Sequence, residues 1–403
     1  MAKFPVPAAV VRFAAVLLFA ATLGACAARP EGGSLLPNAI EAPGAVTQEI
    51  FVATTRQRAD SEALMFNGER RSLDEDVSDL DFARVAVSLP PNHVAGNIEW
   101  ARRLPGDPSK EFVTRSRSYV DSADAFRDQL RQAVAAKPKG KRQVLVFVHG
   151  FNTKFDEGVY RLAQIATDTG FEGVPVLFTW ASRGGVLEYV YDRDSSTVAR
   201  DGLEETLRAA AASGAESVVL FAHSMGNWVA IEALRQAKIA GTPDFGGKLG
   251  DVILASPDID VDVFKAQMRR YGQPKRPFLM FTARDDRALL VSALIAGDRP
   301  RVGGYTNDSE IAELGVIVVD LTNVDSGDNL NHAKFTLVGA GFAERLQARL
   351  AAGDALEEEQ GTTLGDRVGQ LGRGLGNTVG ATAGIIITTP LAILSAPIEL
   401  LGP

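Results

Sequence analysis

Short apolar runs recur along the middle of the chain, and none of them alternates between apolar and polar positions. They cover residues 144–148, 174–180, 218–221, 252–254, 278–281 and 316–319. A strand that is buried on both faces of a sheet shows this pattern. Segments with helical periodicity separate most of the runs, at residues 155–169, 196–212, 225–240, 288–296 and 333–352. The repetition predicts an α/β fold with a mostly parallel central sheet that helices cover on both sides.

The part of the chain before residue 142 has a different pattern. Residues 48–55 and 82–89 are expected to be strands, and residues 122–136 have helical periodicity. The second strand alternates and is followed by two prolines, so we expect both to enter the sheet in antiparallel fashion. A single domain is therefore predicted over residues 47–350.

The N-terminus is expected to be a signal peptide of residues 1–25. Residues 13–21 lack polar side chains, and this run is too short to span a bilayer. The peptide ends in Leu-Gly-Ala before Cys26, which resembles the lipobox of bacterial lipoproteins. The resemblance implies that Cys26 is lipidated and anchors the protein in the cell envelope on the periplasmic side. Ala27 resembles the outer-membrane sorting pattern, for a host with two membranes. An ordinary cleaved signal peptide, with Cys26 incidental, is the alternative.

Two further segments flank the domain. Residues 26–46 are rich in Ala, Pro and Gly and are predicted to be a tether. Residues 351–403 form an apolar tail in which glycine recurs every fourth residue. That spacing weakens a helix in water but favours close helix packing in lipid. The tail is either a membrane-inserted or self-associating segment or a flexible segment on the protein surface, because two prolines interrupt its apolar part.

Composition narrows the possible functions. The 403 residues carry 42 basic and 50 acidic side chains, for a net charge of −8, so nucleic acid is not an expected partner. The single cysteine excludes an intramolecular disulfide and a cysteine-based metal cluster. The histidines lack paired spacing, and no glycine-rich phosphate loop follows a strand. We therefore expect no metal site and no cofactor.

A candidate nucleophile follows the third apolar run. Residues 218–226 read VVLFAHSMG, so that a strand leads into Ser224 and a helix begins at about Met225. This pattern is typical of a nucleophile elbow, a strained turn that raises the serine side chain above the sheet edge. Small residues two positions before and after it, here Ala222 and Gly226, let neighbouring backbone pass close by.

A serine nucleophile needs a base and an acid, and in hydrolases of this kind they follow it in the order acid, histidine. His332 is the only histidine after Ser224, so it is the predicted base. Asp286 is the preferred acid, because it follows a strand and directly precedes a helix. The other candidates are Asp285 beside it, and Asp258 and Asp260 after the preceding strand.

An oxyanion hole needs two backbone N–H donors. Met225, directly after the nucleophile, is the first expected donor, and Phe151, in the loop after the first apolar run, is the second. His149 in that loop is expected to be structural. We expect His223 to point away from the nucleophile and His93 to be a plain loop residue.

Several motifs in order carry a family resemblance. VFVHGFN, FTWASRG, AHSMGN, SPDIDVDVF and DRAL together resemble a bacterial family of α/β-hydrolase-like proteins of unassigned function, often lipoproteins. The resemblance covers residues 46–345 and implies the α/β-hydrolase fold with Ser–Asp–His machinery. It also implies that Trp180, Ser182 and Tyr189 lie near the pocket mouth, although Trp180 at a strand end equally fits a core aromatic. Short connections after residues 180 and 257 predict a short cap.

These observations predict a membrane-tethered serine hydrolase that acts on carboxylic esters, either small molecules or lipids, through an acyl-enzyme. An acyltransferase with the same residues is a second hypothesis, because the sequence does not separate transfer to water from transfer to another acceptor. A non-catalytic envelope scaffold, whose lipid and tail matter more than its pocket, is a third.

Overall fold

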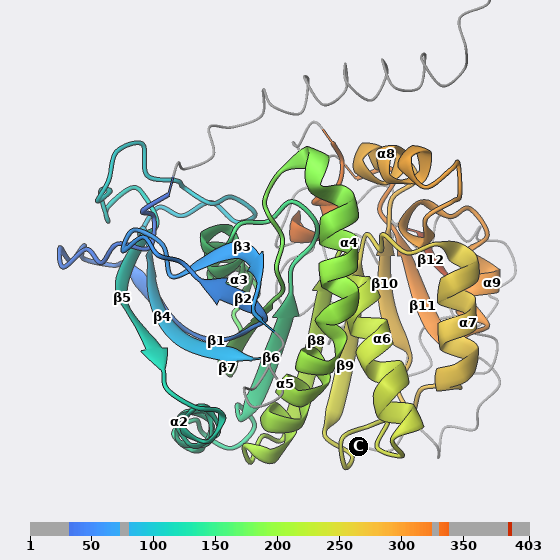
Figure 1. Ribbon diagram of the computed structural model, residues 1–403, viewed down its shortest axis with the longest axis horizontal. Coiled ribbons are helices and arrows are strands. Elements are labelled where there is room, and N and C mark those ends of the chain that lie inside the picture. Colours follow the sequence, from blue (N-terminus) through green and yellow to red (C-terminus); the bar gives the residue numbers. More distant parts are fainter. Residues whose placement is uncertain (1–31, 73–79, 325–329, 338–385, 389–403) are drawn as a thin grey trace, which may run out of the picture. The chain divides into compact units, whose positions relative to one another are not determined.

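The computed structural model describes residues 32–72, 80–324, 330–337 and 386–388, and its main feature is a ten-stranded sheet (Figure 1). The strand order is β12-β11-β10-β9-β8-β6-β7-β1-β4-β5. The strands are β1 (Val46–Thr54), β4 (Asp81–Leu89), β5 (Val113–Val120), β6 (Gln143–Val148), β7 (Val174–Thr179), β8 (Ser217–His223), β9 (Leu249–Ala255), β10 (Phe278–Thr282), β11 (Val316–Asp320) and β12 (Ile386–Thr388). Two shorter strands, β2 (Arg56–Arg58) and β3 (Phe66–Arg70), pair separately. The expected signal peptide, Cys26 and most of the tail lie outside the described residues.

The direction of the strands agrees with the sequence pattern. The seven strands β1, β7, β6, β8, β9, β10 and β11 lie in this order in the sheet, and each pairs in parallel with the next. β4 pairs antiparallel with β1, and β5 pairs antiparallel with β4. The predicted α/β-hydrolase architecture, a mostly parallel sheet entered by antiparallel N-terminal strands, is confirmed. The ends of the parallel strands form one edge, here called the carboxyl edge, where the sites of such sheets lie.

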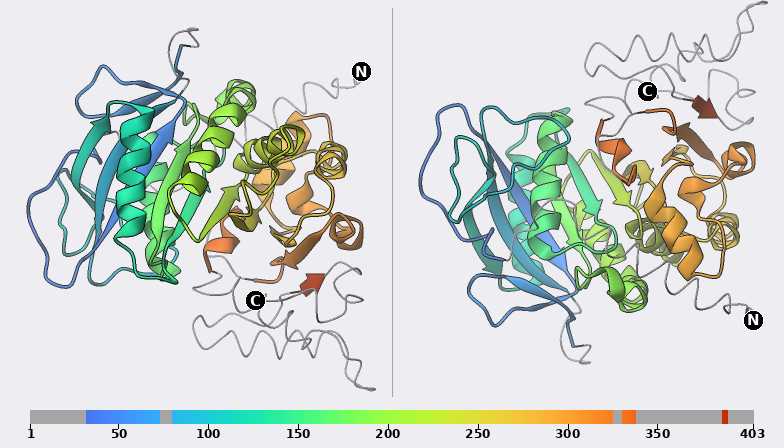
Figure 2. Two further views of the ribbon diagram at one scale, coloured as in Figure 1. Left: turned by 90° about the horizontal axis from the view of Figure 1, so that it is seen from below. Right: turned by 90° about the horizontal axis from the view of Figure 1, so that it is seen from above.

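Helices cover both faces of the sheet (Figure 2). Apolar side chains of α2 (Ala123–Ala135), α5 (Arg200–Ala212), α6 (Gly226–Ile239) and α7 (Val261–Tyr271) pack on one face. α3 (Phe155–Asp168) packs on the other face. The remaining helices are α4 (Tyr189–Val198), α8 (Arg287–Ile295) and α9 (Asp308–Ala312), with short 3₁₀ turns η1 (Val186–Glu188), η2 (Val302–Gly304) and η3 (Lys334–Leu337). In the described ranges, none of these helices combines the length and the apolar character that a bilayer-spanning helix requires.

Several connections differ from the sequence prediction. The helix expected over residues 196–212 is two helices, α4 and α5, which meet at Ala199. α7 lies in the connection between β9 and β10, where the apolar residues that it buries are interspersed with charged ones. β5 was not predicted, because its middle is polar and half-exposed at the sheet edge. Only η3 of the helix expected over residues 333–352 lies within the described part of the chain.

The start of α6 packs very closely against the end of β6. A Cβ atom added to Gly226 would lie 2.4 Å from the carbonyl oxygen of His149 and 2.6 Å from that of Val148. Both of these are backbone atoms, which cannot swing aside as a flexible side chain does. Any side chain at position 226 therefore forces α6 away from the sheet.

Gly226→Ala is expected to lower the free energy of unfolding by about 2–3 kcal/mol, because the methyl group has no space. Gly158→Ala is the matched control. A Cβ there meets nothing closer than 3.5 Å, and the site lies inside α3. Alanine favours a helix over glycine by roughly 1 kcal/mol. Denaturant unfolding of both variants checks this, and equal midpoints would contradict the packing described.

Candidate active site

The elbow after β8 has the backbone geometry that the sequence predicted. Ser224 adopts a positive φ of 53°, although it is not glycine. This conformation costs roughly 1 kcal/mol or more, so its neighbours must hold it. The N–H of Ser224 donates to the carbonyl of Ala255 at 2.9 Å, and its own carbonyl accepts from the N–H of Asp258 at 3.2 Å. The turn is thus fastened to the end of β9 on one side and to the following loop on the other.

Asn227 adds a second support that the sequence analysis did not single out. Its side chain is fully buried. Its Nδ2 donates to the carbonyls of Ser224 and Ala255, each at 2.9 Å. The amide therefore joins the strained turn to the end of β9. Its place in AHSMGN, three residues after the serine, was the available signal.

His332 and Asp286 are in direct contact. The Nδ1 atom of His332 lies 2.6 Å from Oδ2 of Asp286. Asp286 is buried, and its other carboxylate oxygen accepts from the N–H of Leu289 as the N-cap of α8. A carboxylate at this distance holds a proton on Nδ1, which leaves Nε2 able to accept one. The acid is itself held rigidly, because it caps a helix and orients the imidazole with the same group.

The loop that carries His332 lies over the ends of β8 and β9. The hydroxyl of Ser256 donates to the carbonyl of His332 at 3.2 Å. The ring of His223 packs 4.7 Å from the His332 ring, measured between centroids. His223 directly precedes Ser224, so these contacts bring His332 to the same end of the sheet as the serine. His223, which was expected to point away from the nucleophile, thus packs against the imidazole of His332.

The other candidate carboxylates each have a different partner. Asp285 pairs with Nζ of Lys334 at 2.8 Å. Asp258 faces Nε of Arg301 at 3.2 Å. Asp260 caps α7, where its oxygen accepts from two backbone N–H groups. Among the four aspartates considered, Asp286 is thus the one that the structure brings to His332.

The loop after β6 passes directly against the elbow. A Cβ at Gly150 would lie 2.7 Å from Cβ of Ser224, so only glycine allows this approach. Among the hydrogen bonds of the described residues, the N–H groups of Phe151 and Met225 donate to no protein acceptor. Both groups thus remain able to donate to a ligand, as an oxyanion hole requires.

A buried arginine, Arg56, holds the loop after β6, and the sequence analysis did not identify it. Arg56 is almost fully buried. It donates to the carbonyls of Thr153 and Ser182 and to the hydroxyl of Thr179, each at 2.8 Å. Burial lowers the pKa of Arg56 to about 10, so the guanidinium stays charged at neutral pH. No local pattern around residue 56 indicates these partners, since they lie far along the chain.

Residues 122–341 match the model of a family described as alpha/beta hydrolase of unknown function (DUF900). The match covers more than half of the 403 residues. The chain belongs to this family. The family description supports hydrolase activity in general, and no curated protein matches the chain. The elbow, the loop after β6 and the Asp286–His332 pair all lie inside the matched segment of this DUF900 protein.

Two of the residues expected near the pocket mouth have their side chains inside the fold. Trp180 and Ser182 are completely buried. The indole of Trp180 stacks on His149 and donates to its carbonyl at 3.0 Å. The hydroxyl of Ser182 accepts from the N–H of Thr153 and donates to Asp192. Trp180 therefore fits the alternative of a core aromatic, and the polar atoms of both residues hold the loop after β6.

His149 is structural, as expected. Its Nδ1 contacts the carbonyl of Gly150 and its Nε2 the hydroxyl of Thr179, both at 2.8 Å. Burial, aided by the charge of Arg56, lowers the pKa of His149 to about 3. Burial and the neighbouring His332 likewise lower the pKa of His223 well below its ordinary value. Both histidines stay neutral at physiological pH, and the lowered pKa makes each of them a weak base.

Tyr189 lies beside the candidate site. Its ring packs edge-on against the ring of Phe151 with centroids 5.2 Å apart. Its hydroxyl lies 2.8 Å from the hydroxyl of Ser292 and 3.1 Å from Asp258. Burial, and then the charge of Asp258, raise the pKa of this phenol. Tyr189 therefore connects the candidate oxyanion loop to α8.

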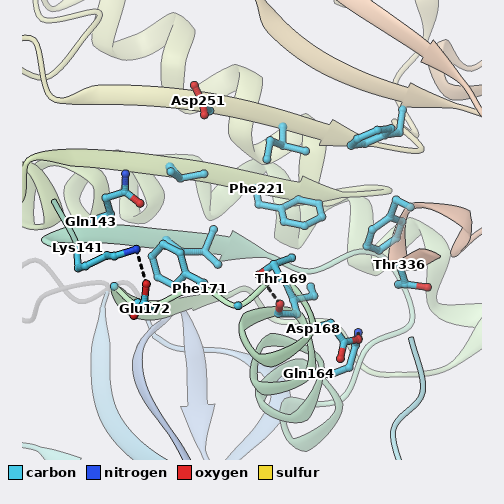
Figure 3. A pocket seen from close by; sticks show the side chains of 18 of the residues that line it. Lys141, Gln143, Gln164, Asp168, Thr169, Phe171, Glu172, Phe221, Asp251 and Thr336 are labelled. Carbon is cyan, nitrogen blue, oxygen red and sulfur yellow. Dashed lines mark hydrogen bonds and ion pairs between the residues drawn. The ribbon is translucent and has the colours of Figure 1, made fainter. Parts of the chain in front are cut away.

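A separate cavity of about 250 Å³ lies on the face of the sheet (Figure 3). Apolar side chains of β6, β8 and β9 line it, together with the end of α3, and Lys141 pairs with Glu172 near one end. Phe335 on its wall packs against His223, but neither Ser224 nor His332 lines it. It is therefore not the candidate active site. Within the described ranges, no group of three or more His, Cys, Asp or Glu residues could hold a metal ion.

His93 differs from the plain loop residue that the sequence suggested. Its Nδ1 lies 2.7 Å from Glu99 and its Nε2 lies 2.8 Å from Asp168 at the end of α3. Burial alone would lower the pKa of His93, but the hydrogen bonds to Asp168 and Glu99 outweigh it and raise the pKa. The imidazolium therefore joins the loop to the helix end.

Stability is expected to depend on pH through His93. Because its pKa is raised on folding, its contribution is complete below the ordinary value of 6.5 and is lost as pH rises through the folded pKa. The free energy of unfolding of the wild type should fall over that range. His93→Gln should flatten this part of the curve, as measured by denaturant unfolding at a series of pH values. Curves of identical slope for the two proteins would refute the role of the ion pair.

Proposed function

We propose that this DUF900 protein is a serine hydrolase that cleaves carboxylic esters, with Ser224 as nucleophile, His332 as base and Asp286 as the acid that orients it. One observation carries the proposal. Asp286 holds His332 through a hydrogen bond of 2.6 Å, and the loop that carries His332 packs over the elbow of Ser224. A strained serine and an oriented imidazole at the same end of the sheet are the groups that nucleophilic acyl transfer needs.

The proposed reaction has two steps. The Oγ of Ser224 attacks the ester carbon while its proton moves to Nε2 of His332. The N–H groups of Phe151 and Met225 stabilise the negative oxygen of the tetrahedral intermediate. The intermediate then expels the alcohol, which takes the proton from His332, and an acyl-serine remains. Water attacks this ester with the same base, and the acid and free serine are released.

The supports around the loop favour this role for Phe151. An oxyanion donor must be in place before the charge develops, because reorganisation during the reaction costs energy. Arg56 and Ser182 fix the loop through contacts to the backbone of Thr153, which follows closely after Phe151. We assign these two residues a positioning function.

The proposal includes a lipid anchor at Cys26. The support is the lipobox-like sequence before this residue, which is the only cysteine of the chain. Two or more acyl chains hold a protein on a membrane almost permanently, whereas one chain binds reversibly. The hydrolase would then act at a membrane surface, on esters that it meets there.

A fluorophosphonate probe tests the nucleophile. The folded wild type should become labelled at Ser224, because the probe traps a serine that a neighbouring imidazole activates. Ser224→Ala should lose the label while keeping the wild-type unfolding midpoint. An unlabelled wild type, or a variant that labels equally well, would rule out this serine as the nucleophile.

The assignment of the acid is tested with two matched substitutions. Asp286→Asn should lower kcat for a short soluble ester by about a thousandfold, because the amide no longer favours the required tautomer. Asp260→Asn should leave kcat unchanged, since asparagine caps a helix as well as aspartate does. Steady-state kinetics of both proteins provide the measurement. A comparable loss in both, or in neither, would count against Asp286.

A further inference from the structure

Five large apolar side chains are exposed beside the candidate site, on the continuous segment η1–α4 and on α8. They are Leu187 (76% exposed), Val190 (61%), Leu290 (56%), Leu294 (54%) and Ile295 (41%), and we call them the apolar rim. Single exposed apolar residues are common on protein surfaces, but clusters of them mark sites of interaction. The rim therefore calls for a partner that covers apolar surface.

A side-chain hydrogen bond between α4 and α8 brings the two parts of the rim together. The hydroxyl of Tyr189, the first residue of α4, lies 2.8 Å from that of Ser292 in α8. Val190 directly follows Tyr189. Leu290 and Leu294 are four residues apart and share the outer face of α8, while Leu289 and Ser292 are buried. Figure 1 shows α8 and the beginning of α4 at the same end of the molecule.

Both rim elements also contact the candidate active site. α8 begins after Asp286, its N-cap, which holds His332. Next to Val190 on α4, Tyr189 packs against Phe151 of the candidate oxyanion loop. A surface that rests on the rim would consequently lie directly above the proposed catalytic residues.

The start of the described chain lies near this end of the fold as well. The carbonyl of Ser34 accepts from the hydroxyl of Tyr160 at 2.6 Å. Tyr160 is five residues into α3, or about 8 Å along a helix that begins just after the candidate oxyanion loop. Only six residues lead from Cys26 to Gly32, and a chain of that length reaches at most about 20 Å. A lipid on Cys26 would therefore hold this end of the domain close to the bilayer.

We propose that the apolar rim docks onto the lipid bilayer that anchors Cys26, so that the candidate active site faces the membrane. The inference rests on the lipid anchor of the proposed function and extends it, because the anchor retains the protein while the rim orients it. Apolar side chains gain free energy by leaving water for the acyl-chain boundary. The substrate class that fits this orientation is an ester held in or on the membrane.

Lipid-borne quenching tests the orientation without relying on activity. The full lipidated chain is reconstituted in vesicles of phosphatidylethanolamine and phosphatidylglycerol that carry a doxyl-labelled phosphatidylcholine. The thiol of Cys26 is occupied by lipid, so Leu290→Cys supplies the one thiol for an environment-sensitive fluorophore. Ile239→Cys is the control, because Ile239 is also exposed (52%) but ends α6, the helix that runs away from Ser224.

We expect doxyl quenching at position 290 to exceed that at position 239 at least threefold. Equal quenching in protein that floats with the vesicles would overturn the docking of the rim. Protein that does not float would overturn it together with the anchor. Shielding of position 290 without lipid quenching, in a protein that elutes as a dimer, would assign the rim to a second copy and also overturn the proposal. Fluorophosphonate labelling of the same samples reports on the hydrolase proposal separately.

Discussion

The hydrogen bond between Asp286 and His332 is the constraint on which the candidate site depends. It joins the end of β10 to a loop that returns after β11, and it does so with a carboxylate that also caps α8. Because Asp286 is buried, the bond is not weakened by competing water. The imidazole is thereby held against His223 and over the strand that leads to Ser224. Without this bond, the loop of His332 would lose a principal contact with the carboxyl edge.

The same edge contains strained or closely packed backbone at several points, and buried polar groups support the elbow and the loop after β6. Ser224 and Ser256 both have positive φ angles. Asn227 donates to the carbonyl of Ser224 and to that of Ala255, the residue before Ser256. Gly150 and Gly226 allow two backbone segments to approach more closely than any other residue would permit. Arg56 then ties the loop after β6 to the N-terminal strands. Such a preorganised edge is what electrostatic stabilisation of a developing oxyanion requires.

Much of the fold and part of the site could be predicted from the sequence. The unbroken apolar runs mark strands buried on both faces, and the order serine, acid, histidine along the chain names His332 as the base. The helix that follows Asp286 favours it as the acid, but the sequence leaves Asp285, Asp258 and Asp260 open. The supporting network could not be predicted, because Arg56 meets Thr153, Thr179 and Ser182 at 97 to 126 residues along the chain. His93 likewise finds Asp168 only through the tertiary fold. Local sequence patterns indicate which residues are buried and which form turns. Contacts between residues far apart in the chain depend on the tertiary fold.

The most direct test of the account is the proton NMR spectrum of the folded protein in water, in the far-downfield region. A proton on Nδ1 of His332 that is shared with a buried carboxylate should give a resolved downfield resonance. The account predicts that this resonance persists in Ser224→Ala and disappears in both Asp286→Ala and His332→Gln. Its absence from the wild type, or its survival in His332→Gln, would contradict the central claim.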